Sequence, residues 1–102
     1  MRYLGGISGS GVVTCGGKGD VRASYDFDGF FREPGGVMGC GEIRLDSAVL
    51  KDVFGRNDVQ LLTDDGRLLD LTFSEKELRA ASEVAHVDVT GQLPSAAQYW
   101  RH

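Results

Sequence analysis

Residues 58 to 74 hold the feature that most constrains the fold, an alternation of apolar side chains on both sides of a short polar segment. Five of the seven apolar side chains fall at odd-numbered positions: Val59, Leu61, Leu69, Leu71 and Phe73. Side chains alternate between the two faces of a strand, and directly opposed residues share a face. The segment therefore predicts a β-hairpin whose loop contains an odd number of residues.

The length of this loop sets the register of the hairpin. A two-residue turn would place Leu69 opposite Leu62 and mix the two faces. A three-residue loop over residues 64–66 places Leu61 opposite Leu69 instead. Such a loop ends in a left-handed residue, and Gly66 adopts that conformation without strain at a Cβ atom. We therefore predict the three-residue loop.

The rest of the chain predicts further extended segments and one short helix. Strands are predicted over 2–15, 20–28 (Val21, Ala23, Tyr25 and Phe27 inward), 37–45 and a last segment ending at Gly91; Gly29 to Phe31 predicts a bulge or bend. Asp46 as N-cap and Gly55 as C-terminal stop predict the helix. Ser74 and Glu77 form a capping-box pattern, so residues 75–82 are open between a helical turn and a turn leading into the last strand.

Together these elements place the chain in the mainly β class, or α+β by strict count. We expect a small antiparallel barrel or sandwich of about six strands, with the short helix at about 46–54 between the third and fourth strands. Residues 1–92 would form the single domain, and residues 93–102 a C-terminal tail. The order of three strands, a helix and two strands resembles the oligonucleotide/oligosaccharide-binding (OB) fold. This resemblance covers the element order over most of the chain and rests on no residue motif, so it implies little about function.

Composition limits the partners and the location that we expect. The chain has 102 residues, 41% of them hydrophobic, which suits one globular domain. Its net charge is −4, and this balance disfavours nucleic acid as a partner. Cys15 and Cys40 fit no zinc spacing and are predicted to be reduced core residues. No apolar run approaches the roughly 18 residues of a membrane span, and no signal peptide opens the chain, so we expect a cytoplasmic protein without a membrane partner.

Four groups of residues have partial signatures of known chemistry. They are a near-match to a phosphate loop (Gly11 to Lys18), a fragment of a calcium loop (Asp26 to Gly29), a scattered nucleophile–base set (Cys15, Cys40, His86, Asp88) and an aromatic set (Tyr25, Phe27, Phe30, Phe31). The first lacks the required spacing and a following helix, and the second lacks the closing glutamate. Nothing in the sequence brings the third set together. Tyr25 and Phe27 share a face with core residues. We therefore expect no enzyme, no cofactor and no metal.

The hairpin register also places Leu62 opposite Leu68 on the outer face. Two leucines there would form an apolar spot on a polar surface. Three predicted covers could pack over it and bury it: the short helix, the tail with Tyr99 and Trp100, or another copy of the chain. Alternatively, the two are rim residues partly covered by their own fold. We assign Leu62, Leu68, Tyr99 and Trp100 to an interaction surface.

Two functional hypotheses follow from the sequence. The first is a non-enzymatic binding or protein-interaction module, with a second copy of the chain, bound through the leucine pair, as one candidate partner. The second is an OB-like module for a single-stranded oligonucleotide or another small polyanion, using the cationic residues Lys18, Arg22, Arg32 and Arg44.

Overall fold

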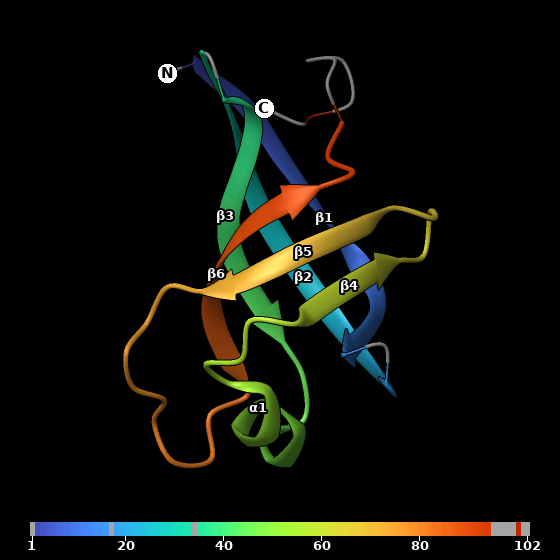
Figure 1. Cartoon of the computed structure of the whole chain (residues 1–102), viewed down its shortest axis with the longest axis vertical. Helices are drawn as coiled ribbons and strands as arrows, with labels where there is room; N and C mark the ends of the chain where they lie inside the picture. The colour runs from blue at the N-terminus through green and yellow to red at the C-terminus, as the bar shows by residue number, and fades with distance from the viewer. Residues whose placement is uncertain (1, 17, 34, 95–99, 101–102) are drawn as a thin grey trace.

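Six antiparallel strands close into a barrel, and one short helix lies at its end (Figure 1). The computed structural model describes residues 2–16, 18–33, 35–94 and 100. The elements in chain order are β1 (Arg2–Cys15), β2 (Lys18–Arg32), β3 (Gly36–Arg44), α1 (Ser47–Val53), β4 (Val59–Thr63), β5 (Leu68–Phe73) and β6 (Val84–Gly91). The prediction of a small antiparallel barrel with a helix between the third and fourth strands is confirmed.

The barrel consists of two three-stranded meanders, and the strands follow one another around it in the order β1-β2-β3-β6-β5-β4. Pairing of β1 with β4 and of β3 with β6 joins the meanders, and α1 lies in the connection between them. Closure gives each strand two neighbours, although β1 pairs with β4 only over Gly11–Cys15. The OB fold is a five-stranded, partly open barrel, so the resemblance ends at the order of the first elements.

The predicted hairpin is confirmed as β4 and β5. Its inward residues pair as expected, Val59 with Leu71 and Leu61 with Leu69, and all four are buried. Thr63 closes the loop by donating its backbone N–H to the carbonyl of Arg67 over 2.8 Å, which leaves three residues between them. Gly66 has a φ of +93°, the left-handed conformation that this loop requires.

The alternation in β2 is also present, and this strand runs further than predicted, to Arg32. The irregularity expected near Gly29 lies on the neighbouring strand, because Leu4 is an extra residue between the pairs Tyr3–Phe30 and Gly5–Gly29. Leu4 is only 1% exposed. The bulge in β1 therefore turns an additional apolar side chain into the core.

Helix α1 begins and ends at the predicted signals. The carboxylate of Asp46 accepts hydrogen bonds from the backbone N–H groups of Ala48 (3.1 Å) and Val49 (3.4 Å). Gly55 follows the helix with a φ of +82°. Leu50 and Val53 are buried in the core, so a helix too short to be stable alone is held by packing on the barrel.

Residues 74–83, between β5 and β6, form an irregular loop without the helical turn, and a turn at residues 80–81 precedes β6. The carboxylate of Glu75 accepts a 2.7 Å hydrogen bond from the backbone N–H of His86, and the N–H of Ser74 donates to the His86 carbonyl over 3.1 Å. These bonds extend the pairing with β6 past the end of β5. The Ser74 N–H, which the Glu77 side chain would accept in a capping box, is thus bound to β6 instead.

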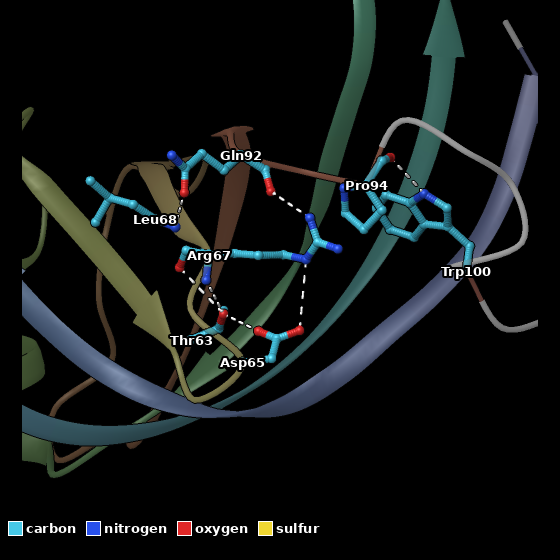
Figure 2. Close-up of polar contacts among 7 residues, drawn as sticks. All are labelled: Thr63, Asp65, Arg67, Leu68, Gln92, Pro94 and Trp100. Atoms are coloured by element: carbon cyan, nitrogen blue, oxygen red, sulfur yellow. Dashed lines mark hydrogen bonds and ion pairs between the residues drawn. The ribbon is translucent and has the colours of Figure 1, made fainter.

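The C-terminal tail contributes to the core. Leu93 (9% exposed) and Trp100 (3% exposed) belong to the same buried cluster as the strand residues. The indole Nε1–H of Trp100 donates a 2.9 Å hydrogen bond to the carbonyl of Pro94 (Figure 2). The tail predicted to lie outside the domain thus supplies the only tryptophan of the chain to its core.

Candidate functional site

The predicted outer-face leucine pair is present on β4 and β5. Leu62 and Leu68 are directly opposed in the register and remain 46% and 38% exposed. On the other side of Leu62 lies Val12 of β1, which is half-buried and continues the same cross-strand row. We call Val12, Leu62 and Leu68 the leucine patch.

Polar contacts border the leucine patch on two sides. On one side, the amide of Gln60 donates a 2.9 Å hydrogen bond to the carboxylate of Asp70. On the other side, the guanidinium of Arg22 binds both carboxylate oxygens of Asp64 at 2.7 Å. These hydrogen bonds hold the pKa of the Asp64 carboxyl below its usual value. The patch is therefore an apolar centre with a polar border, in which the charge of Arg22 is balanced.

A second set of contacts fixes the backbone of Leu68 (Figure 2). The side-chain oxygen of Gln92 accepts from the Leu68 N–H over 2.9 Å, and the Gln92 N–H donates to the Leu68 carbonyl over 3.0 Å. Arg67 donates to the Gln92 carbonyl over 3.2 Å and forms an ion pair with Asp65 at 3.7 Å. In Figure 2 the Leu68 side chain points away from this network, toward solvent. The two hydrogen bonds from Gln92 thus fix the Leu68 backbone in the orientation that exposes its side chain.

Two of the three predicted covers lie elsewhere. Helix α1 is at the end of the barrel beside the start of β6 (Figure 1). The ring of Trp100 packs against β2 at Gly29, where an added Cβ would lie 2.4 Å from the ring. Trp100 was predicted to belong to the interaction surface; because it is buried in the core, we leave it out of the patch. Tyr99 lies outside the described residues.

The opposite side of the barrel carries a different surface. In the strand order, β3 lies opposite β4. Exposed carboxylates of β2, β3 and β6 occupy neighbouring register positions there, and we call them the acidic face: Asp26, Asp28, Glu42 and Asp88. His86 lies within it, with Nε2 3.4 Å from Glu42. These four carboxylates thus lie away from the leucine patch, whereas Asp64 and Asp70 border it.

The structure brings some members of the predicted nucleophile–base set together. Cys40 pairs directly with Asp88, and His86 is two residues further back on the same face of β6. Burial raises the pKa of the Cys40 thiol, and the charges of Asp28 and Asp88 raise it further. A nucleophilic cysteine needs the opposite shift, toward the thiolate. This arrangement therefore lacks the activation that covalent catalysis requires.

Cys15 is a half-buried free thiol at the end of β1. Its Sγ–H donates to the carboxylate of Asp58 over 3.2 Å, and that carboxylate also binds Arg56 through two nitrogens. Burial raises the pKa of the Cys15 thiol, and the hydrogen bond to Asp58 adds to the effect. The thiol thus acts as a donor that ties β1 to the segment before β4.

The remaining motifs are strand residues. Gly11 lies inside β1, so the phosphate-loop near-match has no following helix. Asp26 and Asp28 are exposed on β2, and within the described ranges there is no group of three or more His, Cys, Asp or Glu that could hold a metal ion. Phe27 is fully buried and stacks on Tyr25 with ring centroids 5.0 Å apart, inside the barrel.

Among the described cations of the predicted polyanion site, Arg22 and Arg44 are diagonal neighbours on β2 and β3, and Arg32 lies apart from them. Arg22 is paired with Asp64, Arg32 is at the end of β2, and Arg44 pairs in register with Ser24 at the border of the acidic face. The Lys18 side chain lies outside the described part of the structure.

Sequence reasoning missed Val12, because its place beside Leu62 depends on pairing between β1 and β4. It also missed a pocket between α1 and residues 78–82, whose lining comes from two distant segments. The only local signal for that pocket was the alanine-rich run after Leu78.

Comparison with protein-family models, with curated proteins and with solved structures gives no match to this chain. In the part of the chain that the structure describes, no helix is long and apolar enough to cross a membrane.

Proposed function

We propose that this chain is a non-enzymatic binding module that associates with a second copy of itself through the leucine patch. The observation that carries the proposal is the exposure of Leu62 and Leu68 as a directly opposed pair on a sheet surface. Contiguous exposed apolar side chains with a polar border are typical of protein interaction sites.

The distribution of charge favours a second copy as the partner. Two chains of net charge −4 repel one another, and the repulsion is smallest when their acidic faces point apart. Contact through β1, β4 and β5 achieves this, because the acidic face lies on the opposite side of the barrel. A two-fold axis through the patch places each apolar row on its counterpart, the self-complementary arrangement of most homodimers.

The contact proposed is small, and we expect a weak dimer that dissociates on dilution. Only Leu62, Leu68 and Val12 supply its apolar centre. The neighbouring polar residues, including Gln60, would form its rim. Interfaces at the low end of the size range belong to transient complexes.

The test compares the molecular mass of variants by light scattering and sedimentation over a concentration series. The wild-type mass is expected to rise toward that of a dimer, whereas Leu62→Asp with Leu68→Asp stays monomeric because the two carboxylates would be buried unpaired. Ser24→Asp with Thr72→Asp adds the same charge at exposed positions outside the patch and serves as the control. It should associate like the wild type.

Two results would refute self-association through the patch. One is a wild-type mass that stays monomeric at every concentration. The other is a mass series for the double leucine variant that matches the wild type while its circular dichroism spectrum is unchanged.

A further inference from the structure

A pocket of about 480 Å³ lies at the end of the barrel, between α1 and the loop that joins β5 to β6. Figure 1 shows the two segments side by side below the strands. The volume falls in the range of about 300–1,000 Å³ that is usual for small-molecule sites. The pocket is remote from the leucine patch and shares no residue with it.

Apolar side chains held by the core line part of this pocket. The ring of Phe54 packs against Phe73 of β5, with ring centroids 5.0 Å apart at an interplanar angle of 52°. Leu78 packs against the main core cluster from the loop side. Both residues line the pocket, together with the small side chains of Ala48 and Ala80. This lining suits a compact apolar group.

The polar part of the lining is cationic. Lys51 and Arg79 contribute positive charges, Ser47 and Ser82 contribute hydroxyl groups, and no carboxylate is among the lining residues. Neither cation forms an ion pair with any residue in the described ranges. In a chain of net charge −4, two cations without a carboxylate partner at one pocket are available to an anionic ligand.

The loop wall is held in a defined shape. Glu75 fixes its start by accepting the backbone N–H of His86 over 2.7 Å. Its far end turns back through a 3.2 Å bond from the N–H of Ser82 to the carbonyl of Arg79. Within that turn Ala81 has a φ of +58°, a conformation that disfavours a residue with a Cβ atom. Residues held in such conformations cluster at ligand sites.

We propose that this pocket binds a small amphipathic anion, with an apolar body against Phe54 and Leu78 and a single carboxylate between Lys51 and Arg79. The apolar body gains from burial. The carboxylate gains charge-assisted hydrogen bonds, which are stronger than those between neutral groups.

Sodium octanoate is the probe, and octan-1-ol is its uncharged match. Backbone ¹⁵N–¹H spectra of the full chain are recorded as each is added. Octanoate is expected to shift the amides of residues 48–51 and 78–82 and to bind at least about tenfold more tightly than octanol, a ratio that one charge-assisted contact supplies.

Arg79→Gln removes a lining cation, and Lys76→Gln removes a cation of the same loop that does not line the pocket. Arg79→Gln is expected to weaken octanoate binding about tenfold and to leave octanol binding unchanged. Lys76→Gln should leave both affinities unaltered, since exposed charges outside the site are screened by solvent and salt. Retained dispersion of the spectra establishes that both variants are folded.

Three outcomes would overturn the proposal. In the first, octanoate up to about 10 mM, beyond the millimolar affinities of weak ligands, shifts none of the pocket amides. In the second, octanol binds as tightly as octanoate. In the third, Lys76→Gln weakens octanoate binding as much as Arg79→Gln does, which would assign the effect to overall charge.

Discussion

Docking of Trp100 against Gly29 makes a sharp prediction about stability. Trp100 is 3% exposed, and truncation of a buried aromatic residue to alanine costs about 3–5 kcal/mol of unfolding free energy. A domain of this size has about 5–15 kcal/mol in total. Trp100→Ala should therefore remove a large share of the stability, even though it changes a residue in the last three positions of the chain.

Gly29 supplies the second half of the test. A Cβ atom at this position would lie 2.4 Å from the Trp100 ring, so the ring or the strand must move. We expect Gly29→Ala to cost about 1–3 kcal/mol, the usual penalty of overpacking. Without the ring, the same change should stabilise the strand by about 0.5–1 kcal/mol, because glycine loses more backbone entropy than alanine on folding.

The double-mutant cycle thus predicts a coupling of about 1.5–4 kcal/mol between the two positions. Urea unfolding followed by circular dichroism measures it in all four proteins, including those without tryptophan. Trp100 is the only tryptophan, so its native emission in Gly29→Ala should also shift to longer wavelength. If Gly29→Ala costs the same with and without the tryptophan, the ring does not pack on this glycine and the assignment of the tail to the core is wrong.

Two further predictions concern the closure of the barrel. Gly11→Ala places a Cβ atom 2.4 Å from the Leu62 carbonyl, and because that neighbour is backbone, we expect a loss of about 1–3 kcal/mol in urea unfolding. Asp58→Asn tests the link to Arg56, whose hydrogen bonds lower the folded-state pKa of Asp58 below its ordinary 3.8. A lowered pKa contributes stability above about pH 4 that is lost as the pH falls through the folded-state value. The variant should therefore unfold at lower urea than the wild type at pH 7, with the difference shrinking below pH 4; a constant difference would contradict this.

The register of the hairpin was predictable because it depends on local information. Parity fixes which residues share a face, and Gly66 selects the loop that preserves this parity. The exposure of Leu62 and Leu68 follows from the same register. The helix after Asp46 was predictable for the same reason, since both of its end signals lie within a few residues of it.

Pairings between distant segments could not be predicted in the same way. A glycine within a strand allows a close backbone approach, and Gly11 of the first strand does lie against the backbone of β4. The identity of that neighbour, and with it the place of Val12 beside Leu62, depends on barrel closure. In loop 74–83 a distant contact overrides a local signal. The sequence has helix propensity there, but the Glu75 carboxylate accepts the His86 N–H of β6 and the segment is not helical.

The tail is a related case, because no local signal places Trp100 in the core. It has no periodicity, and the site that receives Trp100 exists only because Gly29 leaves room on β2. A glycine within a strand often marks the close approach of another group. The sequence has such a glycine at position 29, but it does not indicate which group packs against it.

The alternation of side chains along the strands places one set of residues in the core and the other set on the surface. Apart from the bulge at Leu4, the buried apolar residues of the strands are odd-numbered, and they fill the barrel. The even-numbered positions face outward, where β2, β3 and β6 carry mostly charged and polar side chains, with Phe30, Met38 and Val84 as exceptions. Leu62 and Leu68 occupy such positions and keep 46% and 38% of their surface in water, so folding realises only part of the free energy that full burial would give. Packing of the barrel therefore accounts for only part of their burial, and the proposed contact with a second copy of the chain would bury the remainder.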